Sequence, residues 1–290
     1  MCIRDSNIIF EKYHGNGNDF IIIDSRNSNI YKKFLSDKTI DIKNLCDRQF
    51  GIGGDGVIFI LEPDRNNYAK MIIYNSDGSE AQMCGNGIRC LVQYLHNSNK
   101  GSYSVSEYRI ETKAGIKIAQ YNNGEITVKM GKPILETKSI PTKIDTKINS
   151  IPSCLFKETN FEQQGYAVGM GNPHLIFFLQ DITKISLSLL GPVFEKHELF
   201  PEKTNVHFSQ IINRDNINVL VWERGAGATL ACGTGACAVH VAAYKLGLCN
   251  SKTVINLPGG NLIINWSRSE DEILMTGNAK KVFSGTYILK

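Results

Sequence analysis

The chain has 290 residues, of which 42% are hydrophobic and 21% are charged, and its formal net charge is +4 at pH 7. This length allows one large domain or two of about 140 residues, each long enough for a hydrophobic core. Lysines alternate with acidic residues, which indicates a solvated surface and argues against a nucleic-acid footprint. No apolar run approaches the roughly 18 residues of a membrane-spanning helix, and the first ten residues contain no signal-peptide core, so we expect a cytoplasmic protein without membrane partners.

Strand-like segments rich in Ile, Val, Phe and Tyr occur in two sets. The first set comprises residues 19–24, 55–61, 69–75, 104–112, 115–121 and 125–130. The second set comprises residues 174–179, 205–212, 217–222, 252–257, 261–266 and 272–277. Each set also contains a central helix-like segment (88–98 and 236–247) and a peripheral one (41–50 and 187–200). The polar segment 137–153, with two prolines, is the best candidate for a connector.

Two short motifs recur in the same order, which indicates an internal duplication. GNGNDFII at 15–22 aligns with GMGNPHLI at 169–176, and CGNG at 84–87 aligns with CGTG at 232–235. The separations, 154 and 148 residues, are close enough to indicate one unit written twice. Two similar lobes can place equivalent groups on opposite sides of one substrate.

The eight cysteines show no CxxC pair and no zinc-like spacing with the six histidines, so we expect no metal site and reduced thiols. Cys84 and Cys232 differ from the others because a glycine-flanked helix begins directly after each. A helix start directs unpaired N–H groups and a positive dipole end at the sulfur, which is expected to lower the thiol pKa. Two such sulfurs could deprotonate a carbon from one face and reprotonate it from the other, without a cofactor. The remaining cysteines are expected to be inert core thiols (Cys46, Cys90, Cys154, Cys237 and Cys249) or to lie in a disordered leader, MCIRDS (Cys2).

Six motifs resemble, in order and spacing, successive signatures of the diaminopimelate epimerase family: KYHGNGNDF, YNSDGSEAQMCGNGIRC, GMGNPH, TNVHF, ERGAGATLACGTGACA and LPGGNLIINW. The resemblance covers residues 8–289. It implies an α/β (α+β) fold of two pseudo-symmetric lobes, each a curved mixed sheet or barrel around a central helix. One lobe would comprise residues 1–131 with 278–290 and carry Cys84, and the other residues 132–277 and carry Cys232. It also implies interconversion of LL- and meso-diaminopimelate without pyridoxal phosphate or another cofactor, by a possible homodimer.

The resemblance also implies roles for individual residues. Cys84 and Cys232 would be the paired acid and base. The backbone N–H groups of the residues after them would hold the reacting carboxylate as negative charge builds (Gly85, Asn86, Gly233 and Thr234). The rest of the substrate would be bound by amides and an adjacent ion pair (Asn18, Asn75, Asn172, Asn205, Glu223 and Arg224). His174 and Glu223 would support the catalytic pair, His14 would be structural, and the remaining histidines receive no functional role (His96, His197, His207 and His240).

The sequence departs from the family pattern at two places. GIGGDG replaces the GIGFDQ of many members, so Gly56 stands where a glutamine is expected to touch substrate, and a water or backbone group would replace that contact. Tyr13 and Asn16 stand where Met and Leu are usual, and we expect them to alter local packing only. Two alternatives stay open: a proline or hydroxyproline racemase on the same fold, and a non-catalytic thiol switch in which Cys84 and Cys232 form a reversible disulfide.

Overall fold

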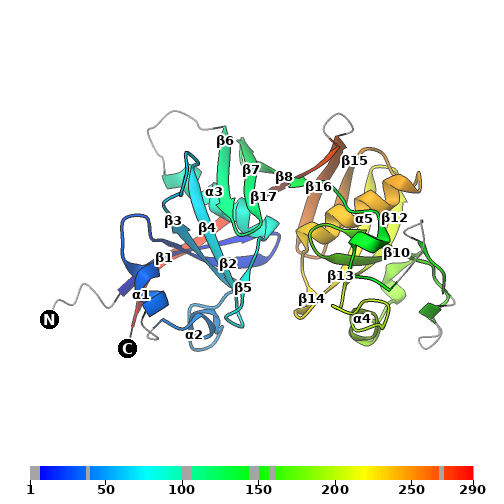
Figure 1. The fold of residues 1–290 in the computed structure, drawn as a ribbon, viewed down its shortest axis with the longest axis horizontal. Coiled ribbons are helices and arrows are strands. Elements are labelled where there is room, and N and C mark those ends of the chain that lie inside the picture. The colour runs from blue at the N-terminus through cyan, green and yellow to red at the C-terminus, as the bar shows by residue number, and fades with distance from the viewer. Residues whose placement is uncertain are drawn as a thin grey trace. The chain divides into compact units, whose positions relative to one another are not determined.

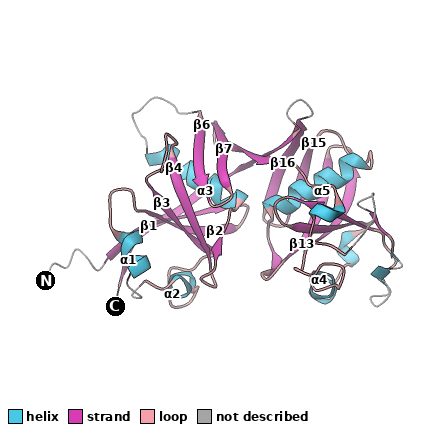
Figure 2. Cartoon of the chain, viewed as in Figure 1, coloured by secondary structure: helices cyan, strands magenta, loops and turns pink. Residues whose placement is uncertain are grey.

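The structure, a computed structural model, describes residues 7–36, 40–98, 106–143, 150–153, 155–156, 161–267 and 271–289 (Figures 1 and 2). The leader with Cys2, and Cys154, lie outside the described residues. The chain divides into two compact units, residues 1–128 with 277–290 and residues 129–276. In the part that the structure describes, no helix combines the length and apolar composition needed to cross a membrane.

The first unit contains a mixed sheet packed against one long buried helix. Its strands are β1 (Asn7–Gly15), β2 (Asn18–Asp24), β3 (Gly56–Leu61), β4 (Ala69–Asn75), β5 (Glu80–Ala81), β6 (Glu107–Thr112), β7 (Gly115–Asn122), β8 (Glu125–Gly131) and β18 (Lys280–Ile288). Its helices are α1 (Ile30–Ser36), α2 (Ile42–Cys46) and α3 (Gly85–Ser98). β18 pairs antiparallel with β1, so the end of the chain completes the sheet in which it began.

The second unit repeats this plan. Its strands are β9 (Ser150–Ile151), β10 (Gly165–Gly169), β11 (Pro173–Phe178), β12 (Asn205–Asn213), β13 (Asn216–Glu223), β14 (Gly227–Thr229), β15 (Lys252–Leu257), β16 (Gly260–Ser267) and β17 (Glu272–Asn278). Its helices are the 3₁₀ turns η2 (Thr137–Ser139) and η4 (Ile182–Lys184), with α4 (Leu187–Glu195) and α5 (Gly233–Lys245).

The two units share one order of strand pairings, which agrees with the fold class that the family resemblance implied. Each contains an antiparallel hairpin, β1–β2 or β10–β11, whose second strand pairs parallel with the next, β3 or β12. That strand pairs antiparallel with β4 or β13, which in turn pairs with a short strand and then, in parallel, with β6 or β15. The central helix follows the short strand in both units, so the repeated motifs occupy equivalent places.

The central helices begin directly after the two cysteines, α3 at Gly85 and α5 at Gly233, as the glycine-flanked cysteines predicted. The helix-like segments expected at 88–98 and 236–247 omit the first three residues of each helix. Cys232 has extended backbone angles (φ −123°, ψ 113°), and its sulfur accepts a hydrogen bond from within the first turn, so it is the N-cap.

The peripheral helices are shorter than predicted. α2 ends at Cys46 because Asp47 is extended and its carboxylate accepts from the N–H groups of Gln49 and Phe50, which would otherwise continue the helix. α4 ends at Glu195 rather than at residue 200.

Small side chains allow strands to approach α5 closely. Most residues of this helix are alanine, valine, glycine or Cys237, and almost all of its positions are buried. This is the pattern of a helix covered on all sides. Each unit also has its own apolar cluster. In the first unit it includes Ile21 and Phe59, and in the second Phe177 and Phe208. The cysteines expected in the core, where described, are buried thiols (Cys46, Cys90, Cys237 and Cys249).

Candidate active site

Cys84 and Cys232 have the same local geometry. Each directly precedes its central helix, and each sulfur accepts a hydrogen bond from the N–H group of the glycine three residues later. The N···Sγ distance is 3.4 Å from Gly87 to Cys84 and 3.3 Å from Gly235 to Cys232. The spacing in CGxG therefore reflects a helix cap made by sulfur, which turns both thiols toward the N-terminal ends of their helices.

The last glycine of each motif is limited by packing rather than by backbone conformation, strictly at Gly235 and more loosely at Gly87, since neither has a positive φ. A Cβ atom on Gly235 would lie 2.2 Å from Cε1 of His207, a distance that no side chain tolerates. A Cβ atom on Gly87 would lie 3.2 Å from methyl groups of Ile58 and Ile73, which is tight but can be relieved by small shifts. The start of α5 is thus seated directly on the His207 ring.

The expected lowering of the thiol pKa is wrong for Cys232. Burial raises the pKa of its thiol well above the ordinary value, and the neighbouring Glu223 carboxylate raises it further. Hydrogen bonds from Thr234 and from the Gly235 N–H group oppose this rise but do not offset it. The helix start favours the thiolate, but the apolar surroundings and the Glu223 carboxylate disfavour it more strongly. Cys232 therefore rests as a thiol.

In the first unit, Asn18 directs its carbonyl oxygen at the cysteine. Its Oδ1 lies 3.8 Å from Sγ of Cys84 and accepts from Nδ2 of Asn86 at 3.2 Å. Its Nδ2 donates to Oδ2 of Asp55 at 2.8 Å, and a carboxylate can only accept, so the amide cannot rotate without losing this bond. The Cys84 thiol consequently faces an acceptor.

Ion pairs hold Asp55 in place. Lys12 contacts Asp19 at 2.8 Å, and Arg48 contacts Asp19 at 2.7 Å and Asp55 at 2.9 Å. Burial raises the pKa of Asp19, but hydrogen bonds from Arg48 and Lys12 outweigh burial and bring it to about 2. Lys12 also donates to the carbonyl of Gly53, so the network anchors the GIGGDG loop.

Gly56 has no room for the glutamine side chain that many family sequences carry at this place. It begins β3 opposite Asn75, and a Cβ atom would lie 2.5 Å from the carbonyl oxygen of Tyr74. Asn75, the last residue of β4, donates from Nδ2 to Oγ of Ser79 at 3.0 Å, which is a turn contact at an exposed position. The turn contact and the binding role expected for Asn75 use the same amide.

Asn16 does more than alter packing, so that expectation is corrected. It lies in the β1–β2 turn at φ 56°, and its Oδ1 accepts from Nη2 of the fully buried Arg89 at 2.8 Å. Arg89 also donates to Oδ1 of Asn86 at 2.8 Å. Asn16 and Arg89 therefore help to orient the Asn86 amide, which in turn reaches Asn18. His14, expected to be structural, accepts from the Gly17 N–H group in the same turn at 3.4 Å.

In the second unit, Asn172 and His174 belong to a buried chain of hydrogen bonds. Nε2 of His174 lies 2.8 Å from Oδ1 of Asn172, and its Nδ1 lies 2.9 Å from Nε2 of His207. Both histidines are fully buried. Burial lowers the pKa of both rings, that of His207 to about 3, so both are neutral near pH 7.

Asn205 and Arg224 are tied together at the ends of their strands. Nδ2 of Asn205 donates to the Pro173 carbonyl at 2.9 Å, and its Oδ1 accepts from the backbone N–H group of Arg224 at 3.0 Å. With only 3% of its surface exposed, Asn205 serves the local structure whatever else it binds. The Arg224 side chain donates to the carbonyl of Glu202 at 3.0 Å.

Glu223 and Thr234 lie close to the Cys232 sulfur. The Glu223 carboxylate accepts from the Thr229 hydroxyl at 2.6 Å and contributes to the raised pKa of the Cys232 thiol. Oγ1 of Thr234 lies 3.5 Å from Sγ of Cys232. In the second unit, contacts therefore join Cys232 to Thr234 and Glu223, Asn172 to His174, and Asn205 to Arg224.

Comparisons with known proteins decide the family. The sequence profile described as diaminopimelate epimerase matches residues 10–136 and 166–282. The diaminopimelate epimerase of Prochlorococcus marinus (strain NATL1A) is 48% identical over 277 residues, which are 95% of this chain and 97% of that protein. That of Nostoc punctiforme (strain ATCC 29133 / PCC 73102) is 45% identical over 282 residues, 96% and 99% of the two chains. The chain belongs to the diaminopimelate epimerase family. The resemblance seen in the motifs is confirmed.

Solved structures with low sequence identity share the fold of this family member. A phenazine biosynthesis protein of the PhzF family from Bacillus anthracis has a TM-score of 0.66 at 14% identity and covers 97% of this chain and 99% of its own. A hydroxyproline epimerase from Agrobacterium vitis, with bound trans-4-hydroxy-L-proline, has a TM-score of 0.67 at 12% identity, with coverage of 98% and 92%. These likenesses confirm the predicted fold class and carry no argument about substrate.

Three residues that contact the predicted site were missed, although each lies inside a family motif: Asp55, Arg89 and His207. Arg89 follows Asn86 by three positions on α3, a spacing that places both on one helix face and could have suggested the contact. His207 alternates with Asn205 on β12, so both point to the same face of the sheet. Nothing in the sequence pairs Asp55 with Asn18, because α1, α2 and the rest of β2 lie between them along the chain.

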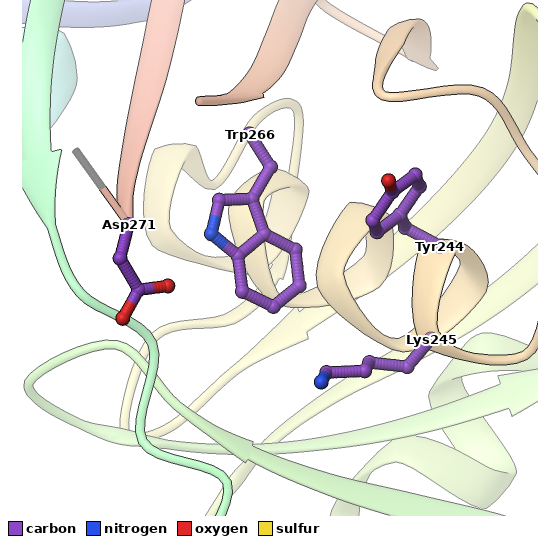
Figure 3. Close-up of a pocket in the computed structure, with 4 residues that line it drawn as sticks. All are labelled: Tyr244, Lys245, Trp266 and Asp271. Atoms are coloured by element: carbon purple, nitrogen blue, oxygen red, sulfur yellow. The ribbon is translucent and has the colours of Figure 1, made fainter. Parts of the chain in front are cut away.

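A surface pocket of about 370 Å³ lies at the far end of α5 and contains none of the predicted residues (Figure 3). The indole of Trp266 lies between Asp271 and the side chains of Tyr244 and Lys245 (Figure 3). Nζ of Lys245 lies 5.5 Å from the Trp266 ring centroid, within the range of a cation–π contact. These contacts attach the last turn of the helix to β16.

Proposed function

We propose that this chain interconverts LL- and meso-diaminopimelate by proton transfer between Cys84 and Cys232, without pyridoxal phosphate or another cofactor. The observation that carries the proposal is the pair of equivalent caps: each family cysteine sits at the start of a buried helix, with its sulfur bound by the third residue of that helix. We infer the substrate, diaminopimelate, from the family to which the chain belongs. The two units would present their sulfurs to opposite faces of the same α-carbon.

The proposed step balances without any co-reactant. A thiolate removes the α-proton, so one C–H bond breaks and one S–H bond forms. The opposite thiol then gives its proton to the other face of the carbanion, so that S–H bond breaks and a C–H bond of inverted configuration forms. The protein finishes with thiol and thiolate exchanged, ready for the reverse reaction. The raised pKa of Cys232 supports its role as the resting proton donor.

The α-carbanion needs electrostatic stabilisation, which the two helix starts are suited to supply. The first N–H groups of a helix have no partner within it and lie at the positive end of its dipole. We assign the N–H groups of Gly85, Asn86, Gly233 and Thr234 to the reacting carboxylate, where charge develops in the transition state.

The distal end of the substrate carries a second carboxylate and a second ammonium. We assign the Arg224 guanidinium to the carboxylate, since its planar fork can donate two parallel hydrogen bonds. The amides of Asn18, Asn75, Asn172 and Asn205 complete the binding site, and Glu223 and His174 act beside the catalytic pair.

The deciding experiment incubates the reduced protein with LL-diaminopimelate in heavy water. Deuterium should enter one α-carbon as meso product accumulates, as followed by mass spectrometry. Cys84→Ala and Cys232→Ala should each lower turnover by at least about 100-fold, because each removes an essential acid or base. Absence of exchange in the reduced protein would refute the proposal and favour the thiol switch.

Arg224→Ala separates this function from that of a proline or hydroxyproline racemase. A small cyclic substrate has no second carboxylate, so its enzyme would not need the guanidinium. We expect the substitution to raise KM for diaminopimelate by about tenfold or more, the size of one lost hydrogen bond between charged groups. Unchanged handling of diaminopimelate, or turnover of L-proline by the wild-type protein, would favour the racemase.

We also propose a homodimer, active in the cytoplasm. Large apolar side chains are exposed on the paired strands β1 and β18, including Ile9 at 72% and Ile288 at 68% exposure, together with Val282 and Phe283. A group of this kind is typical of an interface, and a second copy of the chain would cover it. Sedimentation should give the mass of two chains, and Ile9→Asp should reduce it to one. A monomeric wild-type protein at micromolar concentration would contradict the dimer.

A further inference from the structure

His207 is a buried histidine that lies between two parts of the proposed site. On one side its Nε2 is 2.9 Å from Nδ1 of His174, whose Nε2 is 2.8 Å from Oδ1 of Asn172. On the other side its ring lies against Gly235, the residue whose N–H group donates to the Cys232 sulfur. The His207 side chain is fully buried, so it does not touch solvent.

In the structure the Oδ1 atom of Asn172 faces Nε2 of His174, and this orientation is consistent with one direction for each hydrogen bond of the chain. The Oδ1 atom of an amide can only accept, so Nε2 of His174 must carry the hydrogen. A neutral imidazole has one N–H group, so Nδ1 of His174 must accept, and Nε2 of His207 must donate to it. Nδ1 of His207 then holds only a lone pair, which fits its lack of a hydrogen-bond partner among the described residues.

We propose that His207 is a positioning residue that fixes, through His174, the Asn172 amide with its NH₂ group available to a substrate carboxylate. The inference rests on the proposed function, which assigns Asn172 to substrate binding. If His174 took the other tautomer, its Nε2 would accept from the amide, and Asn172 would rotate to present an oxygen. That oxygen would repel a carboxylate, so the donor on His207 decides which polarity the substrate meets.

The first test reads the tautomers directly by two-bond ¹H–¹⁵N NMR of the histidine rings at pH 7.5. In the wild-type protein, both His174 and His207 should show the Nε2–H tautomer. In His207→Leu, nothing holds Nδ1 of His174 in the acceptor state, so His174 should show a mixture of tautomers. A wild-type His174 with the hydrogen on Nδ1, or an unchanged His174 spectrum in His207→Leu, would overturn the proposal. The wild-type spectrum decides the matter even if the variant does not fold.

The second test measures the effect on substrate binding. His207→Leu should raise KM for LL-diaminopimelate by about tenfold, the size of one hydrogen bond to a charged group, and should change kcat much less. The same substitution in an Asn172→Ala background should add no further rise, because the amide through which it acts is gone. Equal effects in both backgrounds would show that His207 acts by another route.

His240→Leu provides the matched control. His240 is a fully buried histidine of the same unit, on α5, and its ring stacks on Tyr244 rather than contacting Asn172. The His240→Leu substitution should leave KM for LL-diaminopimelate unchanged. A rise in KM equal to that of His207→Leu would show a general effect of removing a core histidine. If the wild-type protein incorporated no deuterium into diaminopimelate, the proposed function would be refuted but the role of His207 would not, since the tautomers are measured without substrate.

Discussion

Single side chains in the site are oriented by partners that cannot reverse their hydrogen bonds. The Asp55 carboxylate can only accept, so it takes the NH₂ group of Asn18 and leaves the oxygen facing Cys84. The Arg89 guanidinium can only donate, so it takes the oxygen of Asn86 and leaves the NH₂ group facing Asn18. In both Asn18 and Asn86, a charged neighbour determines which way the oxygen and the NH₂ group of the amide point.

Asp55→Ala should therefore impair the reaction although Asp55 is not a predicted binding residue. Without the carboxylate, the Asn18 amide can rotate and present its NH₂ group to the sulfur. We expect kcat/KM to fall by about tenfold, the equivalent of ~1.4 kcal/mol, in a steady-state assay. Asp64→Ala is the matched control, since Asp64 pairs with Lys70 at the surface. Equal kinetics of the two variants would contradict the role of Asp55.

Some residues of the candidate site could be predicted from the sequence, whereas their electrostatic environment and some of their contacts could not. The repeated CGxG motif singled out Cys84 and Cys232, whereas the binding roles of Asn18 and Asn172 were implied by the family resemblance. The rise in the Cys232 pKa was not predictable, because it depends on burial and on Glu223, which approaches through the fold. The contact between Asp55 and Asn18 spans 37 residues and follows no spacing rule.

At the scale of elements, the two central helices depend on glycines that make room for the sheet. The helix starts were predictable, because the glycine-flanked cysteines indicated a helix beginning directly after each, whereas the particular N–H group that bonds each sulfur was not. The pairing of β18 with β1 joins the two ends of the chain, and only the family resemblance suggested it. Local pattern predicts elements well, whereas pairings between distant strands depend on packing that a pattern does not contain.

Gly235→Ala should disturb the second unit more than Gly87→Ala disturbs the first. The added methyl group would lie 2.2 Å from the His207 ring but 3.2 Å from the isoleucine methyls near Gly87. We expect Gly235→Ala to lower the free energy of unfolding by about 1–3 kcal/mol, as overpacking does, in urea titrations. Adding His207→Ala should restore part of the loss. An equal effect of the two glycine substitutions would contradict the seating of α5 on His207.

At the scale of the whole molecule, three buried histidines make stability depend on pH. Burial lowers the pKa of His174, His207 and His240, that of His207 to about 3 and that of His240 to about 4. The unfolded chain binds protons at these groups near pH 6.5, before the folded chain does, so folding stability is complete above that pH and falls below it.

The free energy of unfolding should therefore decrease between pH 6 and pH 4.5 by about 1.4 kcal/mol per pH unit for each of these histidines. Urea titrations at half-unit intervals would measure the slope. His240→Leu should reduce it by one such increment while leaving the neighbouring His174–His207 pair intact. Parallel curves for variant and wild type would show that His240 does not titrate as its burial implies.

The opposed amides of Asn18 and Asn172 mean that the duplicated halves have lost their interchangeability. Both asparagines end a G-x-G-N motif. The Asp55 carboxylate binds the NH₂ group of Asn18 and leaves its oxygen available, whereas His174 binds the oxygen of Asn172 and leaves its NH₂ group available. The two units therefore share a strand order but present different hydrogen-bonding groups at equivalent turns.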